Sequence, residues 1–297
     1  MDLLRFVVGI DGADASDAAL AWSLATASIG GEDLLLVTVV ERPAGQTIAD
    51  CRPRQLEEAE RLLARAADRI PEAMQDRVAT RILVGPAAQT LAEFCGEGDI
   101  LVVGTHKTGF LHGRVTGSRS LQLAARARSR LVVVPGVPST GRRGIVVGLT
   151  PGRDWTGAVR SAGVYASRFG EEVRIVQAAD PSAVESTWAP QSELAAVDPA
   201  LLVTAAIEHQ LAEEFPGVRV QSRLSQRDAV AAFLDASRAA RLLIVPVLDD
   251  ERAVDFVGSV AHDVLLNINA PVILMPAAVM DGPRPVDSDG GGRSRSE

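Results

Sequence analysis

One succession of strand-forming and helix-forming segments occurs twice in this chain, the second time about 140 residues after the first. Residues 6–10, Phe-Val-Val-Gly-Ile, return within residues 144–149, Gly-Ile-Val-Val-Gly-Leu, and the strand ending at Pro135 returns as the one ending at Pro276. A repeat this long is two copies of a domain, not the short unit of a solenoid. The 297 residues suit two domains of about 150 residues each.

Within each copy, short β-branched runs alternate with alanine-rich or amphipathic segments. Such alternation predicts βαβ units and a parallel sheet with helices on both faces. The predicted fold class is α/β, with two tandem doubly wound, Rossmann-like domains that each hold a five-stranded parallel sheet. The expected strands of the first copy are 5–12, 34–40, 78–84, 100–103 and 131–134, and its helices are 16–28, 55–70, 89–95 and 121–128. The second copy repeats the strands at 144–149, 173–178, 218–224, 242–245 and 271–276, and the long helix at 201–215.

We expect one domain over 1–138 and a second over 139–279. The tail, 280–297, consists mostly of Gly, Pro, Ser, Asp and Arg and is expected to be disordered, because it has almost no apolar surface to bury.

Composition excludes several classes of protein. The net charge of −8 argues against nucleic-acid binding, and no apolar run approaches the 18 residues of a membrane span. A strand that starts at residue 5 leaves no room for a signal peptide. Cys51 and Cys95 form no CxxC pair, which predicts two free thiols in a reducing, cytoplasmic environment.

The segment 104–120 carries the strongest functional signal, because a strand enters a glycine-rich loop there and a helix leaves it after Gly117-Ser118. Glycines let the backbone approach a ligand closely, and the amides at a helix N-terminus attract phosphate. The segment also carries the basic residues Lys107, Arg114 and Arg119. It is neither a Walker A loop, since Phe and Leu follow Gly109 where Lys and Ser/Thr are needed, nor a GxGxxG fingerprint.

The segment resembles the universal stress protein family, whose nucleotide-binding members carry Gly-x2-Gly-x9-Gly-(Ser/Thr). Here the pattern runs Gly104-x2-Lys107-x9-Gly117-Ser118. The start of the chain, Val-Gly-Ile-Asp-Gly over 8–12, resembles the family's first strand. The strand 36–40 resembles its second, with Thr at position 38 where the family usually has His. The resemblance covers 5–135 well and 144–276 more weakly.

This resemblance implies tandem or single α/β domains, dimerisation and, in some members, ATP binding. It implies that an Asp after the first strand and a backbone group after the usual His contact adenine. It also implies that edge strands pair between copies, so we expect the last strand of each half to lie at an edge and the halves to form a pseudo-dimer. The implied nucleotide-binding residues are Asp11, Val39, Gly104, Lys107, Gly117, Ser118 and Arg119.

Four of these residues have alternative roles. Lys107 replaces a glycine, so it adds a cation for the triphosphate, reshapes the loop and weakens ATP binding, or simply lies in solvent. Asp11 followed by glycine is also ordinary turn chemistry, and Gly117-Ser118 is also an ordinary helix cap.

The second copy has lost this set of residues. Thr150 stands in the place of Asp11, and Pro246 in the place of Gly104. Residues 246–259 hold four acidic residues and one arginine, a net charge of −3, whereas 104–119 hold three basic residues and no acid, a net charge of +3. Because like charges repel, we expect one ATP per chain, in the first half. Gly258-Ser259 is expected to remain as a helix cap.

The sequence therefore predicts a stress-response regulator that binds ATP, with or without Mg²⁺, as a conformational ligand. No catalytic residue, general base or metal site is identified, so we do not expect an enzyme. The expected partners are the adenine nucleotide, a protein partner and a second domain or chain, with no nucleic acid and no membrane. The alternative is a protein-interaction module of the same fold that binds no nucleotide. A true ATPase or kinase is the weakest hypothesis.

Overall fold

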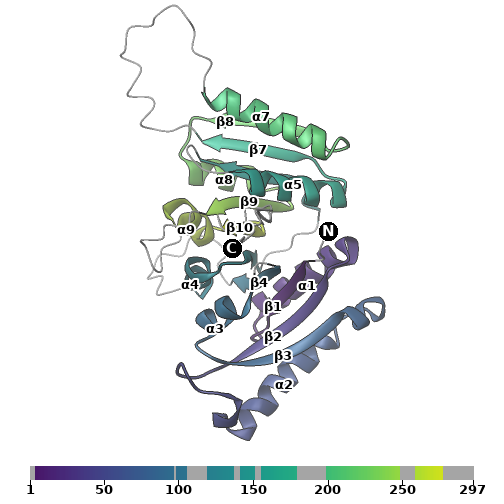
Figure 1. The fold of residues 1–297 in the computed structure, drawn as a ribbon, viewed down its shortest axis with the longest axis vertical. Helices are drawn as coiled ribbons and strands as arrows, with labels where there is room; N and C mark the ends of the chain where they lie inside the picture. The colour runs from purple at the N-terminus through teal and green to yellow at the C-terminus, as the bar shows by residue number, and fades with distance from the viewer. Residues whose placement is uncertain are drawn as a thin grey trace, which may run out of the picture.

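The computed structural model describes residues 4–96, 98–105, 119–136, 141–150, 155–178, 199–247 and 258–276. Its strands form one sheet of ten, in the order β3-β2-β1-β4-β5-β10-β9-β6-β7-β8 (Figure 1). The first five belong to the first half of the chain and the last five to the second half. The predicted α/β fold is therefore confirmed.

The first half is a doubly wound parallel sheet. Chain order and spatial order differ, because β1 lies between β2 and β4, and every neighbouring pair of its five strands is parallel. The strands are β1 (Arg5–Gly9), β2 (Asp33–Glu41), β3 (Val78–Gly85), β4 (Asp99–Thr105) and β5 (Arg130–Pro135). The helices are α1 (Asp14–Gly30), α2 (Pro53–Ala67), α3 (Ala87–Phe94) and α4 (Arg119–Arg126), with 3-10 turns η1 (Ile48–Asp50) and η2 (Glu72–Arg77).

The second half repeats this topology, with β6 between β7 and β9 and all neighbours parallel. Its strands are β6 (Ile145–Leu149), β7 (Val173–Ala178), β8 (Val220–Ser225), β9 (Leu242–Val247) and β10 (Val272–Pro276). Its helices are α5 (Thr156–Phe169), α7 (Pro199–Glu214), α8 (Ala229–Ser237) and α9 (Ser259–Leu266). As predicted, α9 begins at Ser259 with Gly258 as its N-cap.

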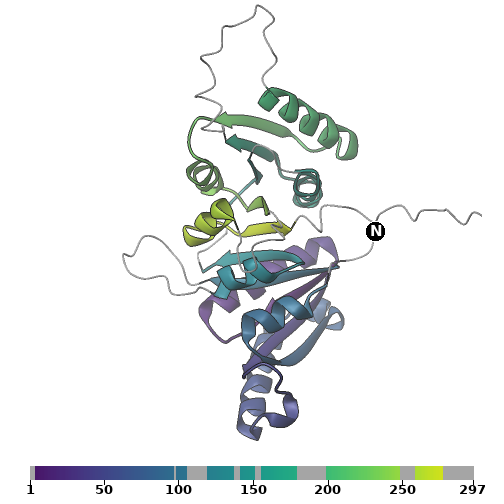
Figure 2. The same cartoon turned by 60° about the vertical axis from the view of Figure 1, so that its left-hand side comes forward.

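The two halves join through one antiparallel pair of strands, β5 and β10, in which Ile273 lies opposite Val132 (Figure 2). Each is the last strand of its half-sheet, so the predicted edge positions are confirmed. The contact goes beyond packing, because backbone hydrogen bonds make the two half-sheets continuous. We call this pair the seam.

Both faces of the sheet carry an apolar layer that crosses the seam. One layer packs under α1, α2, α5 and α7, with Phe6, Leu20 and Ile207 fully buried. The other packs under α3, α4, α8 and α9, and Phe233 is fully buried in it. Since each layer contains residues of both halves, the apolar core is shared between them.

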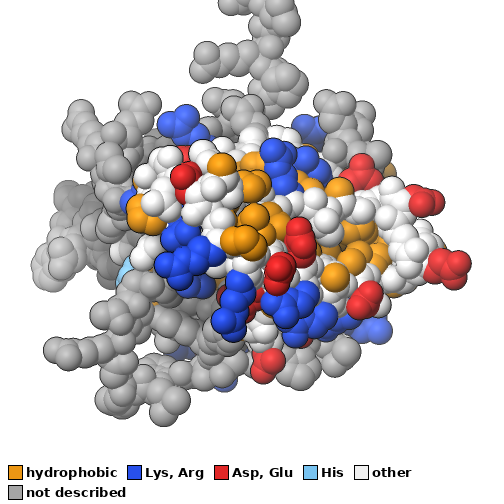
Figure 3. All heavy atoms as spheres, turned by 90° about the horizontal axis from the view of Figure 1, so that it is seen from below, with side chains coloured by type: hydrophobic (Ala, Val, Ile, Leu, Met, Phe, Trp, Pro, Cys, Tyr) orange, Lys and Arg blue, Asp and Glu red, His pale blue; other side chains and the backbone are white. Residues whose placement is uncertain are grey.

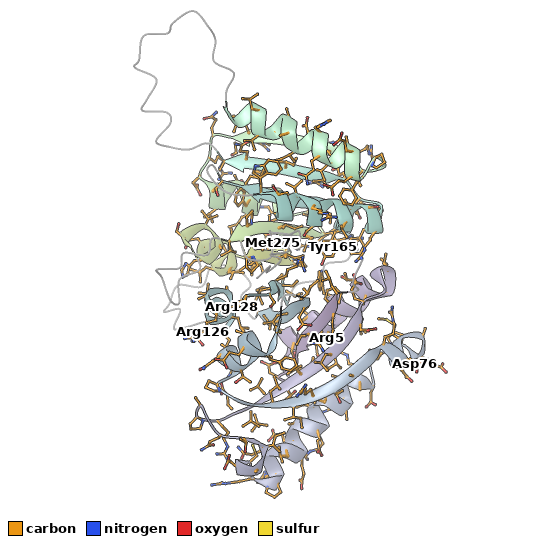
Figure 4. All side chains as sticks on the ribbon, in the orientation of Figure 1. Arg5, Asp76, Arg126, Arg128, Tyr165 and Met275 are labelled. Atoms are coloured by element: carbon orange, nitrogen blue, oxygen red, sulfur yellow. The ribbon has the colours of Figure 1, made fainter. Side chains whose placement is uncertain are left out.

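A buried polar cluster lies at the same junction. Arg168, in the last turn of α5, pairs with Glu32, which precedes β2 and is 2% exposed. Burial raises the pKa of the nearby Tyr165 hydroxyl and lowers the pKa of Arg130, which begins β5. Figure 4 places Tyr165 and Met275 where the halves meet, with Met275 Sδ 3.9 Å from Ser161 Oγ. The halves are therefore also linked through a charge pair whose carboxylate is almost fully buried.

Glycine ends the first helix of both halves. Gly31 has φ of 83° and Gly170 has φ of 63°, and their N–H groups donate to the carbonyls of Ala27 and Ala166. This left-handed C-cap suits glycine, because it has no Cβ to clash. The sequence predicts the first of these caps from Gly30-Gly31.

Neither charge sign dominates the described surface at one end of the molecule (Figure 3). Seen from the end at which β3 is the edge strand, basic and acidic side chains lie interspersed with apolar ones (Figure 3). Arg126 and Arg128, at the end of α4, are exposed (Figure 4).

Candidate functional site

A cavity of about 500 Å³ lies where β1, β2 and β4 end in the first half. The order of the strands reverses between β1 and β4, and the carboxyl ends of parallel strands at such a switch point are where open α/β sheets bind ligands. Helices α1 to α4 complete its walls. The lining is Gly9, Ile10, Asp11, Ala15, Ser16, Val37, Thr38, Val39, Glu41, Leu62, Ala87, Ala88, Leu91, Val103, Gly104, Thr105, Arg119, Ser120 and Leu123.

Asp11 sits in the turn between β1 and α1, at the mouth of the cavity. Its Oδ1 accepts a hydrogen bond from the Ala13 N–H at 3.0 Å, which is the turn chemistry that Asp-Gly predicts. Gly12 follows with φ of 80°, and a Cβ there would come within 2.6 Å of Leu62 Cδ2 on α2. The turn is thus tight enough for α2 to pack over it, while Oδ2 of Asp11 faces Arg119.

Val39 lies on β2 beyond the point at which β1 stops. The two strands are paired only as far as Gly9 and Val37, whereas β2 continues to Glu41. The Val37 carbonyl accepts from the Ile10 N–H, and alternation along the strand turns the backbone groups of Val39 to the same side. The backbone of Val39 therefore borders the cavity.

Thr38 fixes this corner from within. Its hydroxyl donates to the Ile10 carbonyl at 2.7 Å, and the residue is buried. The short side chain thereby ties the end of β1 to β2.

Gly104, near the end of β4, lies against the backbone of α1. A Cβ at this position would stand 1.9 Å from the Ala15 carbonyl oxygen and 2.8 Å from the Ser16 nitrogen. The residue is glycine because the first turn of α1 occupies the space, whether or not a ligand also approaches it.

Arg119 opens α4 and reaches across the cavity mouth to the ends of β1 and β2. Its guanidinium lies 3.9 Å from Asp11 Oδ2 and 3.4 Å from Glu41 Oε2. Sequence reasoning missed Glu41. The signal was available, because Glu41 is the charged last residue of the strand whose backbone borders the cavity.

The structure therefore brings together four of the seven predicted site residues, Asp11, Val39, Gly104 and Arg119, around one cavity. Lys107, Gly117 and Ser118 lie outside the described residues, as do His106, His112 and Arg114 of the same segment.

Neither cysteine belongs to this site. Both are free thiols, and Cys95 is buried. Burial raises the pKa of the Cys95 thiol to about 12, with the nearby Asp99 carboxylate acting in the same direction. Cys95 is therefore a protonated thiol at neutral pH and a poor nucleophile.

The described part of the chain contains no group of three or more His, Cys, Asp or Glu residues that could hold a metal ion. No helix in it is long and apolar enough to cross a membrane.

The corresponding place in the second half is almost filled. A cavity of only about 20 Å³ remains there, bordered by Gly148, Thr150, Pro246 and Gly258 at the positions of Gly9, Asp11, Gly104 and Gly117. The fully buried ring of Phe233, on α8, packs on Gly148, where a Cβ would lie 2.7 Å from ring atom Cδ2.

The first half has Leu91 at the place of Phe233, on α3, with its Cδ1 3.8 Å from an ideal Cβ of Gly9. The ring of Phe233 thus fills space in the second half that is open in the first half. Comparing the two copies of the repeat in sequence did not reveal this difference. The acidic segment 248–257 lies outside the described residues.

Comparison with known proteins finds similarity to one family, matched directly in the first half of the chain. Residues 4–135 match the model of the universal stress protein family. A relative from Mycolicibacterium smegmatis (strain ATCC 700084 / mc(2)155), described as a universal stress protein, is 28% identical over 255 residues, which cover 80% of this chain and 85% of the relative.

Solved structures share the fold over almost the whole chain. A universal stress protein from Archaeoglobus fulgidus DSM 4304 gives a TM-score of 0.68 at 15% identity, covering 92% of this chain and 98% of that one. A protein of unknown function, PA1789 from Pseudomonas aeruginosa PAO1, gives 0.57 at 12% identity and covers 94% of each chain. At these identities the likeness concerns the fold alone.

Proposed function

Because residues 4–135 match the model of the universal stress protein family, we propose that the chain is a member of this family and that its first half binds an adenine nucleotide, ATP. The observation that carries the proposal is the cavity of about 500 Å³ at the switch point of the first half-sheet. Its volume lies within the range of about 300–1,000 Å³ usual for sites that bind small molecules and cofactors.

The lining suits a base attached to a charged group. Aliphatic side chains such as Val37, Leu91 and Leu123 offer apolar walls for a planar ring, and the backbone edge at Val39 offers hydrogen-bonding groups to it. Arg119 supplies a cation at the mouth, at the N-terminus of α4, where a helix dipole favours negative charge. An adenine between the apolar walls and phosphates beside the cation at the mouth match this arrangement.

The proposed division of the chain follows from the same repeat. Residues 1–138 form the nucleotide-binding domain, 139–279 form a second domain whose cavity is closed, and 280–297 form a tail. We propose one nucleotide per chain, acting as a conformational ligand for a stress-response regulator rather than as a substrate.

Calorimetric titration tests this proposal directly. We expect a stoichiometry of one ATP per chain, and loss of binding in Gly117→Glu, which inserts bulk and negative charge where the phosphates approach. The matched variant Gly258→Glu should leave ATP affinity almost unchanged. Asp11→Ala should weaken ATP more than GTP, because it removes a contact to the base.

Four results would contradict the proposal. A stoichiometry of two would show that the second half also binds ATP. Binding that survives Gly117→Glu but is lost in Gly258→Glu would place the site in the second half. Absence of nucleotide both in the titration and in the denatured purified protein, analysed by mass, would favour the interaction module. Sustained phosphate release would indicate an ATPase.

A further inference from the structure

The guanidinium at the cavity mouth is shared by two carboxylates. Nη1 of Arg119 lies 3.9 Å from Oδ2 of Asp11, and Nη2 lies 3.4 and 3.5 Å from the two oxygens of Glu41. These three side chains carry two negative charges and one positive charge. An entering anion therefore meets a cation that already has partners.

These pairs are weak enough to exchange. The side chains of Arg119, Asp11 and Glu41 are 61%, 54% and 60% exposed, and ion pairs in such surroundings contribute little to stability. A phosphate beside the N-terminus of α4 can accept two parallel hydrogen bonds from an arginine, whereas both oxygens of Glu41 face the single nitrogen Nη2 of Arg119. Ligand binding would thus draw Arg119 away from the end of β2.

The two carboxylates are not equivalent. Asp11 has a second role, because its other oxygen accepts the Ala13 N–H and holds the turn before α1. Glu41 is the last residue of β2, its backbone is fixed by pairing with Gly85 of β3, and both its oxygens face the same nitrogen of Arg119. Glu41 is therefore the residue whose charge can be removed without disturbing the turn.

Resting on the proposed function, we propose that Glu41 sets the phosphate selectivity of this site. Its carboxylate competes with the phosphates of the ligand for Arg119, and so weakens the binding of a polyphosphate nucleotide relative to the uncharged nucleoside. Glu41 is a specificity-determining residue that acts through Arg119 and need not touch the base.

The test compares ATP with adenosine on the full chain, by calorimetry at low salt and with EDTA present. Glu41→Gln should raise ATP affinity about three- to tenfold, as expected for removing one nearby charge in a solvated setting, and adenosine affinity should change less than about twofold. The gain for ATP should shrink as salt is added, because exposed charges are then screened.

Two further variants isolate the cause. Glu93→Gln removes an exposed carboxylate on α3 that does not line the cavity, and should leave both affinities unchanged. Arg119→Gln should weaken ATP, and adding Glu41→Gln to it should bring much less than the gain seen in the parent, because there is no guanidinium left to compete for.

The outcomes separate this inference from the proposed function. If neither ATP nor adenosine binds the parent chain, both are overturned. If both ligands bind and Glu41→Gln changes their affinities by the same factor, or weakens ATP, the selectivity role alone is overturned. A gain of undiminished size in the Arg119→Gln background would overturn competition for Arg119.

Discussion

Gly104 shows how one residue serves the fold at a position where the sequence suggests a ligand. The Gly-x2-Lys-x9-Gly-Ser pattern assigns it to phosphate approach, but the backbone of Ala15 already occupies the space in which a side chain would lie. Substitution here would force β4 and α1 apart.

We therefore expect Gly104→Ala to lower the free energy of unfolding by about 2–3 kcal/mol through overpacking. The matched control is Gly96→Ala, because a Cβ at Gly96 meets no atom within 4 Å, and its change should stay within about 0.5 kcal/mol. Urea unfolding with no ligand present measures both. Equal stability of the two variants would show that α1 can shift without cost, and that the glycine is not required for packing.

At the scale of single residues, the sequence predicted which residues line the cavity better than it predicted which side chains contact one another. Asp11, Val39, Gly104 and Arg119 do line one cavity, because their strand ends and their helix start were placed correctly. The roles of Glu41 at the cavity mouth and of Phe233 in the second cavity were not predicted. Their roles depend on which side chains face one another across elements distant in sequence, and no local pattern carries that information.

Among the elements, α3 and α8 decide how much space remains above their half-sheets. They occupy equivalent places, but α3 presents Leu91 to the cavity, and α8 presents the larger ring of Phe233 to Gly148. A single position on one helix therefore accounts for part of the difference between a cavity of about 500 Å³ and one of about 20 Å³.

Exchanging these side chains tests the effect of shape apart from charge. Leu91→Phe should reduce ATP affinity by about tenfold or more, because the ring takes space that the base needs, whereas the volume-conserving Leu91→Met should change it little. Phe233→Leu should enlarge the second cavity without creating a nucleotide site, since Thr150 and Pro246 remain. Full ATP affinity in Leu91→Phe, measured by calorimetry in a variant that unfolds cooperatively, would mean that the base lies elsewhere.

The sequence predicted the helices and strands in which apolar residues follow a strong pattern. The ten strands were expected to within a few residues at each end, and so was α2, whose leucines lie along one face. The helix α5 was not singled out, because Gly157 and Gly163 weaken its helical signal. The structure explains Gly163, at which a Cβ would come within 2.3 Å of the Phe215 ring beside α7. The requirement comes from a neighbouring helix and not from the local sequence.

The whole molecule is held as one unit by the seam, by two apolar layers that cross it and by the buried pair of Glu32 and Arg168. Two domains with separate cores would unfold in two steps. Because these halves share a sheet and a core, we expect one cooperative transition for the full chain.

Arg168→Met should strongly lower the free energy of unfolding of the whole molecule. It leaves the Glu32 carboxylate buried without its partner, which costs about 3–5 kcal/mol, and adding Glu32→Gln should recover part of the loss. Arg160→Met, on the same helix, removes an exposed pair with Glu214 and should cost less than about 1 kcal/mol. Calorimetric unfolding distinguishes the cases. If Arg168→Met and Arg160→Met melted alike, the buried pair would not hold the halves together.

The seam also changes how the assembly responds to dilution. Two separate chains that met through such edges would be paired only above a threshold set by their dissociation constant. Residues 136–144 connect the two halves within one polypeptide, and a short tether fixes the effective concentration of one half around the other on the order of millimolar. The pairing of the halves is therefore independent of how much protein a cell makes, and a cell holding a few copies has the same paired molecule as a cell holding thousands.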